Sequence, residues 1–438
     1  MNSPVFALVD CNNFYASCEK LFRPDLRHTP VVVLSNNDGC VVSRSREAKA
    51  LGIKMAVPFH TLQGLVRQHG VVAFSSNYAL YADISQRVMS TLEQLAPRVE
   101  VYSIDEAFLD LSGIVRGVPQ PAGAAPVTSL QAFGQQLQAT IYQWVGMSVG
   151  VGIAPTKTLA KLANYAAKHY PATGGVVDLT DPERQRRLLA ITPVEEVWGI
   201  GHQLAKQLAR FRIDNALALA TADRYWLRKQ FNVVVERIAR ELQGRSCLVL
   251  DEVATPKQQI MCSRSFGARI TDPQAMGEAI ASYAARAAEK LREQRQYAKS
   301  LTVFIRTNPF SAQDPYYSNA ATCQFPVPTD DTRALLDQAR ALLAQIWRDG
   351  YRYMKGGVLL ADFYDPGVYQ PDLFHPPGLR PDLQRNSKAL MQVLDRINHS
   401  GKGRVWFAGE GTDRLWSMKR EHLSPAYTTR WEDLPVVR

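Results

Sequence analysis

The sequence predicts an α+β protein built from several domains, and three observations support this prediction. Short apolar runs that end at polar residues alternate along the chain with segments of helical periodicity. The chain is 438 residues long, which at roughly 150 residues per domain suggests about three domains. Residues 366–385 contain five prolines and predict an extended linker before a C-terminal tail.

Strands and helices interleave in the first half of the chain. Apolar runs predict strands at residues 5–9, 31–34 and 147–153, with two more between 101 and 111. Helical spacing predicts helices at residues 45–52, 81–95, 131–145 and 156–169. Ser45 suits the N-cap of the first of these helices, and Gly52 suits its C-terminal end. Residues 117–126, rich in Pro, Gly and Ala, predict a surface loop.

The second half repeats this alternation after a helical stretch. Residues 193–244 are predicted to be mostly helical. Beyond them we expect helices at residues 275–295 and 331–348, and strands near 301–306 and 356–362. This pattern predicts a second small α+β domain, and no period of 20–50 residues repeats.

The positive charge is concentrated in the middle of the chain. The formal net charge is +10. Residues 1–110 hold 10 basic and 11 acidic side chains, net −1, whereas residues 155–250 hold 15 and 9, net +6, and residues 257–306 hold 9 and 4, net +5. This distribution favours carboxylate chemistry in the first domain and binding of a polyanion by later ones. A solvated Lys/Arg surface without a partner is the alternative.

Cysteine use and hydropathy indicate the compartment. The six cysteines are scattered and form no CxxC pair, which argues against a zinc ribbon or a disulfide scaffold. The N-terminus has no signal-peptide pattern, and no run of 18 apolar residues occurs. We therefore expect a soluble, reduced, cytoplasmic protein that has no membrane partner.

Three carboxylates stand beside predicted strands. Asp10 follows one apolar run, and the adjacent pair Asp105 and Glu106 precedes another. Carboxylates at the ends of neighbouring strands lie close together and repel one another, so a divalent cation is their natural partner, and hard oxygen ligands favour Mg²⁺. The alternative is that these acids are ordinary turn residues.

The residues around these acids resemble the active-site motifs of Y-family DNA polymerases. The resemblance rests on Asp10-Cys11-Asn12-Asn13-Phe14-Tyr15 and Tyr102-Ser103-Ile104-Asp105-Glu106-Ala107-Phe108. Ordered blocks at residues 35–42, 74–78, 150–164 and 423–430 are similar to the UmuC-type branch, the catalytic subunits of DNA polymerase V. The resemblance extends over essentially the whole chain.

This resemblance implies a right-hand polymerase with a ferredoxin-like palm, small fingers, a helical thumb, an α+β little finger and a C-terminal tail. The implied boundaries are palm 1–35 and 80–190, fingers 36–79, thumb 191–250, little finger 255–365, and clamp-binding linker and C-terminal tail 366–438. The implied activity is error-prone translesion DNA synthesis in the SOS response, by attack of a primer 3′-OH on a dNTP. No separate acid cluster suggests a proofreading exonuclease.

The resemblance also assigns roles at the acidic cluster. Asp10 and Asp105 would bridge two Mg²⁺ ions, with Glu106 on the catalytic ion and the backbone carbonyl of Cys11 completing one metal shell. Tyr15 matches the steric gate, an aromatic ring that leaves no room for a ribose 2′-OH; core packing is the alternative for this ring.

Basic residues are assigned to phosphates in the same way. Ser43, Arg46, Lys49 and Lys168 match positions that hold the dNTP triphosphate, although Arg46 replaces a tyrosine of some relatives. The first three are expected on or just before the helix at residues 45–52, sharing one face. Lys157 and Lys161 match contacts to primer phosphates. A solvated surface charge is the alternative for each lysine.

Other DNA contacts are expected downstream. Residues 197–208 predict a helix-hairpin-helix in which Gly199 and Gly201 let backbone N–H groups approach a phosphate; a glycine turn between packed helices is the alternative. In the expected little finger, Arg264, Arg269 and Lys299 are candidate phosphate contacts.

The tail contains partner signals. Gln370, Leu373 and Phe374 resemble the QxxLF peptide that docks on the sliding clamp, and packing against the protein body is the alternative. The family resemblance further implies contacts of the tail with a processed UmuD-type dimer and the RecA filament, at the nucleoid. Two rival functions remain: an inactive DNA-binding repair scaffold, and a metal-dependent nuclease.

Overall fold

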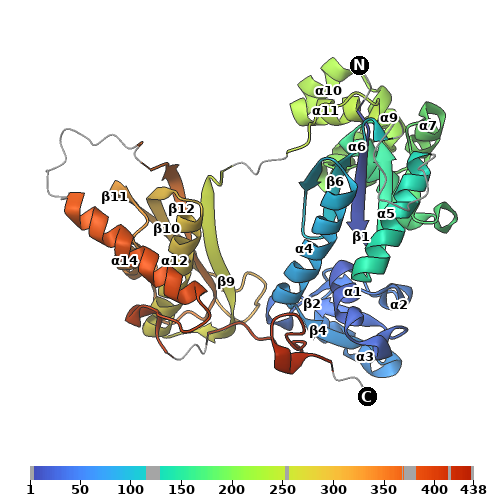
Figure 1. Ribbon diagram of the computed structural model, residues 1–438. Coiled ribbons are helices and arrows are strands. Elements are labelled where there is room, and N and C mark those ends of the chain that lie inside the picture. The colour runs from blue at the N-terminus through green and yellow to red at the C-terminus, as the bar shows by residue number, and fades with distance from the viewer. Residues whose placement is uncertain are drawn as a thin grey trace. The chain divides into compact units, whose positions relative to one another are not determined.

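The protein is described by a computed structural model that covers residues 4–114, 129–251, 256–366, 368, 381–412 and 416–435, with residues 381–386 given by backbone only. Two compact units are formed (Figure 1). The first unit consists of Met1–Leu34, Cys40–Ala254 and His422–Arg438, and the second of Ser35–Gly39 and Thr255–Glu421. The predicted loop at residues 117–126 lies outside the described residues.

The first unit is built on a five-stranded sheet in the order β5-β6-β1-β7-β8. Its strands are β1 (Phe6–Cys11), β5 (Val99–Val101), β6 (Glu106–Asp110), β7 (Val149–Ala154) and β8 (Val176–Asp178). The central strand β1 is fully buried and runs antiparallel to both neighbours, β6 and β7. A strand buried on both faces reads as a continuous apolar run, which is why residues 5–9 stand out in the sequence.

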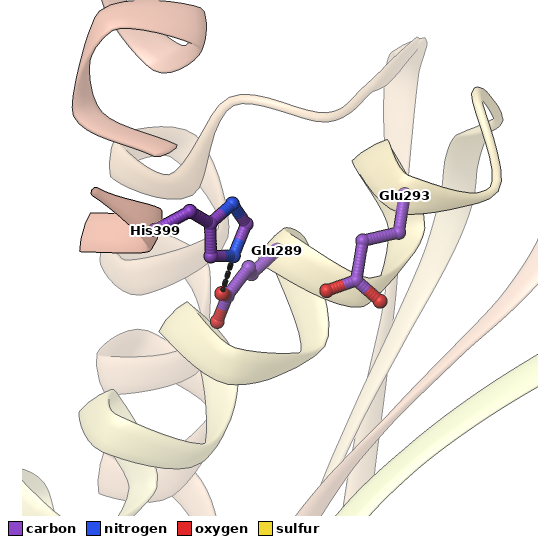
Figure 2. Close-up of side chains that lie close together, drawn as sticks. All are labelled: Glu289, Glu293 and His399. Atoms are coloured by element: carbon purple, nitrogen blue, oxygen red, sulfur yellow. Dashed lines mark hydrogen bonds and ion pairs between the residues drawn. The ribbon is translucent and has the colours of Figure 1, made fainter. Parts of the chain in front are cut away.

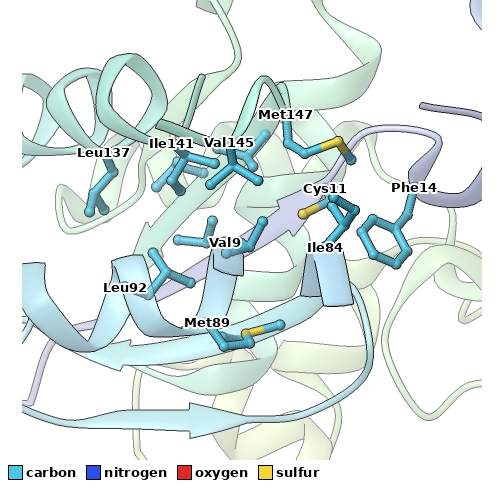
Figure 3. Packing of buried hydrophobic residues seen from close by; sticks show 14 of the residues in the cluster. Val9, Cys11, Phe14, Ile84, Met89, Leu92, Leu137, Ile141, Val145 and Met147 are labelled. Carbon is cyan, nitrogen blue, oxygen red and sulfur yellow. The ribbon is translucent and has the colours of Figure 1, made fainter. Parts of the chain in front are cut away.

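Helices cover both faces of this sheet. Helices α4 (Tyr78–Leu95) and α5 (Leu130–Val145) pack on one face around Val9 and Cys11, as Figure 3 shows. On the other face α6 (Lys157–His169) packs on the side chains of Phe6 and Leu8. This division follows from the two-residue period of a strand, which sends neighbouring side chains to opposite faces.

Helix α6 lies unusually close to β7 because of a glycine. A Cβ added at Gly152 would lie 2.2 Å from the backbone nitrogen of Asn164 and 2.3 Å from the carbonyl oxygen of Ala160. The Asn164 side chain also donates a hydrogen bond of 2.8 Å to the carbonyl of Gly150. The glycine-rich sequence of β7 therefore lets the backbone of α6 rest directly on the sheet.

A small three-stranded sheet, in the order β3-β2-β4, has its own apolar core. Its strands are β2 (Val31–Leu34), β3 (Val41–Arg44) and β4 (Val72–Ser75), accompanied by the helices α1 (Phe14–Leu21), α2 (Arg46–Ala50) and α3 (Gln63–His69). Ser45 caps α2 as expected, by accepting a hydrogen bond from the backbone of Ala48. The helix nevertheless has only five residues, because Gly52 adopts a left-handed conformation shortly after it.

Five short helices follow α6 and β8. They are α7 (Pro182–Ile191), α8 (His202–Ala209), α9 (Ala216–Thr221), α10 (Arg224–Gln230) and α11 (Val233–Leu242). Side chains of Asp181, Asn215, Asp223 and Asn232 cap four of them by accepting backbone hydrogen bonds. Frequent caps explain why the predicted helical region is divided into such short segments. Its apolar residues share one core with α6.

The second unit has a four-stranded sheet in the order β11-β10-β12-β9. Its strands are β9 (Gln259–Ile270), β10 (Tyr297–Arg306), β11 (Ser318–Thr329) and β12 (Tyr353–Tyr364). Helices α12 (Pro273–Glu293) and α13 (Thr332–Ile346) pack with it around one core. The predicted α+β pattern is confirmed, but β9 and β11 were missed because many of their residues are exposed and polar.

The C-terminal region is divided between the units. Helix α14 (Pro381–His399) begins inside the segment predicted as linker, which corrects that prediction: Pro381 occupies the first helical position, where its missing N–H costs nothing. An ion pair of Arg292 with Asp395, at 2.6 Å, holds α14 in the second unit. Trp416 is buried in the second unit's core, whereas Tyr427 is buried in the first unit's core.

Short 3-10 helices complete the structure: η1 (Pro24–Leu26), η2 (Asn36–Asp38), η3 (Phe59–Leu62), η5 (Pro171–Thr173), η6 (Val194–Glu196), η7 (Ala408–Glu410) and η8 (Trp431–Asp433). Segment η2 belongs to the second unit. There the Asn37 side chain donates hydrogen bonds to the carbonyls of Ser265 and Phe266 in β9. Within the described residues, no helix has the length and apolarity needed to span a membrane.

Candidate active site

Three carboxylates meet at one end of the five-stranded sheet. Asp10 on β1 lies directly opposite Glu106 on β6 in the antiparallel register. The turn before β6 carries Asp105, whose carbonyl accepts a 2.9 Å hydrogen bond from the Cys11 N–H. Strand β1 extends one residue past Asp10, so this acid lies within the ladder, not after it as the sequence suggested.

Burial makes the charge on Asp10 costly. The side chain is largely buried, and desolvation raises the pKa of its carboxyl from 3.8 to about 7, with the Lys168 ammonium opposing this rise and Glu106 adding to it. Lys168, in the last turn of α6, places Nζ 2.5 Å from Asp10 Oδ1. The site therefore needs positive charge, and part of it comes from α6.

A second lysine of α6 faces the other acid on the sheet. Lys161 Nζ lies 2.6 Å from Glu106 Oε2, and both side chains are mostly buried. The same ammonium lies 4.5 Å from the ring centre of Tyr102 and 5.6 Å from that of Trp198. Helix α6, held close to β7 by Gly152, thus supplies a cation for each of the two facing carboxylates.

Ser103 fixes the turn that carries the acids. Its hydroxyl donates to Asp105 Oδ1 at 2.7 Å and accepts from the backbone N–H groups of Asp105 and Glu106, at 3.3 and 3.1 Å. The sequence prediction did not single out this residue. A serine two and three residues before a functional pair is a recognisable turn signal that could have identified it.

The donor set fits a divalent cation. Asp10, Asp105 and Glu106 supply only carboxylate oxygens, which hard cations prefer. The Cys11 side chain does not add a ligand of this kind, because burial, followed by the charges of Asp10 and Asp105, raises the pKa of its thiol and keeps it protonated. Any contribution from Cys11 would come from its backbone carbonyl, as the resemblance implies.

Tyr15 lies on α1 inside a cluster of aromatic rings. Its ring stacks on Tyr81, with centroids 4.3 Å apart and planes at 15°, and meets Tyr78 edge-on at 6.3 Å. The ring is only partly buried, so it is neither a fully enclosed core residue nor a free surface side chain.

The expected triphosphate ligands of the small sheet occupy different settings. Ser43 lies in β3, just before α2 as expected but not on a helical face shared with Arg46 and Lys49, and its hydroxyl accepts a hydrogen bond from Ala16 N at 3.2 Å. Lys49 is half-buried, and burial, Arg44 and Lys168 together lower the pKa of its ammonium. Arg46 is the first residue of α2. Because α2 has only five residues, its helix dipole attracts anions only weakly.

Lys157 is placed differently from Lys161. Its side chain is buried, forms an ion pair with Glu100, and lies 5.1 Å from the ring centre of Phe108. The same Glu100 carboxylate accepts a 2.7 Å hydrogen bond from the backbone of Asp251. The Lys157 ammonium is therefore neutralised by Glu100 within the first unit, so its burial does not require a DNA phosphate.

The glycines of the expected hairpin precede α8. Gly199 has a φ of 91°, which favours glycine, and Gly201 is the N-cap of α8. A Cβ added at Gly201 would meet nothing within 4 Å, so the turn has open space on this side. The N–H of Ile200, between the two glycines, donates to the Val197 carbonyl at 2.9 Å.

The second unit carries a pair of cations that the sequence did not reveal. Arg306 on β10 and Lys355 on β12 are directly opposite each other in the sheet register. Like charges in this position destabilise a sheet, and burial together with Arg306 lowers the pKa of Lys355. Both side chains are only partly buried, so two facing positive charges remain within reach of an anion. Among the described residues, Arg306 Nε is buried without a hydrogen-bond partner.

The basic residues singled out earlier in this unit lie on neighbouring strands. Arg264 and Arg269 belong to β9, and Lys299 belongs to β10. Arg264 is exposed, whereas Nη1 of Arg269 is buried without a hydrogen-bond partner within the described residues. The expected clamp-binding residues Gln370, Leu373 and Phe374 lie outside the described residues.

A second group of potential metal ligands lies in the second unit. Glu289 and Glu293 of α12 and His399 of α14 bring ligand atoms within 4.8 Å of one another (Figure 2). His399 Nε2 and Glu289 Oε1 are 2.9 Å apart. Arg286 already contacts both carboxylates, so the group is better explained as a polar contact between α12 and α14 than as a metal centre.

Comparisons with known proteins identify the family. The model of the impB/mucB/samB family matches residues 9–165, and that of its C-terminal domain matches residues 257–373. Protein ImpB of Salmonella typhimurium is 53% identical over 99% of this chain and 100% of its own length. This chain belongs to the impB/mucB/samB family. A third model, a domain of unknown function (DUF4113), matches residues 388–437 of this family member.

Other family relatives and one solved structure agree. Protein UmuC of Salmonella typhimurium is 52% identical over 99% of this chain and 100% of its own length. DNA polymerase IV of Caulobacter vibrioides is 28% identical over 84% of this chain and 86% of its own. A Y-family DNA polymerase chimera matches 82% of this chain and 99% of its own, with a TM-score of 0.64 and 20% identity. The predicted family and polymerase fold are confirmed.

Proposed function

We propose that this member of the impB/mucB/samB family is a DNA-directed DNA polymerase that extends primers across damaged template positions with low fidelity, in the SOS response. The observation that carries the proposal is the facing pair Asp10 and Glu106, with Asp105 beside them and a lysine of α6 against each facing acid. The family and the polymerase fold support it.

The acids are the proposed metal ligands. Asp10, Asp105 and Glu106, with the carbonyl of Cys11, would hold two Mg²⁺ ions. Bound there, the ions supply Lewis-acid stabilisation of charge on the attacking and leaving oxygens. Ser103 holds the Asp105 carboxylate in place. Because Lys168 pairs with Asp10 and Lys161 with Glu106, they offset two of the three carboxylate charges before the ions bind.

Nucleotide binding is assigned to residues around this cluster. Lys168 and Lys49, which lie near enough for the Lys168 charge to help lower the pKa of Lys49, suit a triphosphate, and Arg46 is a further ligand. Ser43 acts at this site through the position of β3 against α1. Tyr15 is the proposed steric gate, because its partly exposed ring is fixed by stacking on Tyr81.

DNA binding is assigned to both units. In the first unit, Lys161, Lys157 and the turn of Gly199 and Gly201 are proposed contacts to primer phosphates. Lys157 is the weaker candidate, because its side chain is more deeply buried than that of Lys161. In the second unit, Arg306 and Lys355 form the proposed anion site, with Arg264, Arg269 and Lys299 on the same sheet.

Partner proteins follow from the family. We propose contacts with a processed UmuD-type dimer, the RecA filament and, through Gln370, Leu373 and Phe374, the sliding clamp. Work on chromosomal DNA would place the protein at the nucleoid in the cytoplasm.

The test is primer extension over an abasic site with Mg²⁺, with the accessory dimer, RecA filament and clamp supplied. We expect extension by the wild type, and none by Asp105→Asn, which should still bind primer-template DNA. Absence of extension by the wild type, with DNA binding retained, would favour a scaffold. Cleavage of DNA without dNTPs would favour a nuclease.

A further inference from the structure

Residues 422–427 belong to the first unit and contact β4 and the end of α1, the helix that carries Tyr15. Leu423 forms a parallel bridge with Ser75 at the end of β4, and the Ser75 N–H donates to the His422 carbonyl at 3.0 Å. Further on, Tyr427 stacks on Phe22 with centroids 4.8 Å apart. Figure 1 shows this dark red segment beside β4. We call residues 422–427 the C-terminal strap.

Asn77 connects the strap to helix α4. Its Oδ1 accepts the capping hydrogen bond from the backbone of Leu80, while its Nδ2 donates to the Ser424 hydroxyl at 2.9 Å. Both Asn77 and Ser424 are buried. One side chain thus defines the start of α4 and holds the strap, so a shift of the strap is transmitted to the first turn of this helix.

Glu19 links the contact between Asn77 and Ser424 to the aromatic cluster around Tyr15. This residue of α1 is fully buried, and Tyr81 in the first turns of α4 donates a 2.6 Å hydrogen bond to Glu19 Oε1. Burial raises the pKa of the Glu19 carboxyl to about 7, a rise that the hydroxyls of Tyr81 and Ser424 oppose. Its other oxygen, Oε2, has no hydrogen-bond partner within the described part. A buried acid of this kind holds its hydrogen-bonded neighbour strongly.

Tyr81 in turn sets the position of Tyr15. The two rings are nearly parallel at 4.3 Å, and Tyr78 meets both edge-on at 6.3 Å. A tyrosine whose ring is stacked and whose hydroxyl is anchored has little freedom to rotate. Ser424, Asn77, Glu19 and Tyr81 therefore form one connected set of contacts that ends at the Tyr15 ring.

We propose that the C-terminal strap and Glu19 are positioning elements for Tyr15, so that rejection of ribonucleotides depends on residues near the far end of the chain. The inference rests on the proposed function, in which Tyr15 is the steric gate. It gives a role to part of the region matched by the domain of unknown function, residues 388–437. The strap and Glu19 do not touch the nucleotide; they act through Tyr81.

The test compares the full-length chain with Tyr81→Phe and Ser424→Ala, each of which removes only a hydroxyl. The readout is the ratio of kcat/KM for a dNTP to that for the matching rNTP on undamaged primer-template. We expect the ratio to fall about tenfold in both variants, with dNTP incorporation nearly unchanged, because displacement of a positioned ring acts on the gate. Glu19→Gln, which keeps an acceptor for Tyr81, should retain the ratio.

Two variants complete the experiment. Arg430→Ala alters an exposed residue beyond the strap and should behave as wild type. Tyr15→Ala should abolish discrimination. The inference is overturned if Tyr15→Ala loses discrimination while Tyr81→Phe and Ser424→Ala keep the wild-type ratio. It is also overturned if kcat/KM falls equally for dNTP and rNTP in these two variants. In both cases the polymerase assignment stands. A wild-type chain that adds neither nucleotide would overturn the proposed function itself.

Discussion

The two large sheets of this protein resemble each other in design and differ in how their charges are balanced. Both are mainly antiparallel and pack against helices through apolar clusters, one on each face of the five-stranded sheet and a single one at the four-stranded sheet. The five-stranded sheet sets Asp10 opposite Glu106 and supplies a lysine for each. The four-stranded sheet sets Arg306 opposite Lys355. Facing like charges are costly in either sheet.

The difference indicates what each sheet binds. In the five-stranded sheet the chain supplies its own cations, so Asp10 and Glu106 are each paired before any metal ion arrives. In the four-stranded sheet, Nε of Arg306 remains without a partner among the described residues. The acids of the five-stranded sheet, paired with lysines, suit a site that binds and releases metal ions during a reaction. The facing cations of the four-stranded sheet suit a surface that binds the phosphate backbone of a nucleic acid.

The largest predicted effect comes from Gly152, the residue that lets α6 bring Lys161 and Lys168 close to the acids of the sheet. Gly152→Ala would place a methyl group against the backbone of α6, which must then move away from β7 together with Lys161 and Lys168. We expect a loss of about 3 kcal/mol in the free energy of unfolding and loss of extension, measured by thermal unfolding and primer extension. Gly64→Ala, at a helical position with open space, is the matched control; equal stability of both variants would contradict the account.

The next prediction removes one lysine from the acidic cluster. Lys161→Met leaves Glu106 largely buried without its cation, so we expect a loss of roughly 1–3 kcal/mol in the free energy of unfolding at pH 7. Urea denaturation measures it. Since Mg²⁺ would replace the missing charge, adding Mg²⁺ should restore more stability to this variant than to the wild type. Absence of this difference would count against a metal site at Glu106.

Removal of a cation from the four-stranded sheet should leave stability intact and weaken DNA binding. Lys355→Gln relieves repulsion with Arg306, so stability should be unchanged or rise by a few tenths of a kcal/mol. DNA affinity should fall, and the slope of log K against log salt should decrease by about one. Fluorescence anisotropy at several salt concentrations measures both. Arg187→Gln, at an exposed position of α7, is the control, and an unchanged salt slope in Lys355→Gln would remove this residue from the DNA surface.

The smallest predicted effect concerns pH. Burial raises the pKa of Glu19 from 4.5 to about 7, so the native state takes up a proton that the unfolded state has released. The stabilisation from this proton is complete below pH 4.5 and is lost as the pH rises through 7. The wild-type Tm should therefore fall by a few degrees relative to Glu19→Gln between pH 5.5 and 8.5. Parallel pH profiles would show that Glu19 does not carry a raised pKa.

Much of this architecture could be predicted from the sequence because local signals coincide with it. The buried strands β1 and β2 are apolar runs, α2 begins at a capping serine, and the family motifs locate Asp10, Asp105 and Glu106. The half-exposed strands β9 and β11 were missed because their polar residues weaken the apolar pattern. The start of helix α14 was missed because its first residues, from Pro381, follow directly on a proline-rich stretch of sequence.

Other features depend on contacts between distant parts of the chain. The pair of Arg306 and Lys355 exists only through the register of β10 with β12. The burial of Lys157 depends on Glu100, and the contact of Ser424 with Asn77 joins residues 347 positions apart. A sequence pattern of a few residues does not encode such contacts, so lysines of one helix with the same local pattern, Lys157 and Lys161, could not be distinguished.

The most direct test of the central claim, that the acids at the end of the five-stranded sheet are the catalytic centre, is single-turnover incorporation of one dNTP by Asp105→Asn and by Asp110→Asn. Asp110 lies at the far end of β6, the strand that follows Asp105, and is paired with Arg98. We expect the rate to fall by about 10³-fold in Asp105→Asn and to stay near wild type in Asp110→Asn, with DNA affinity equal in all three proteins. Incorporation by Asp105→Asn at a rate close to wild type would contradict the account.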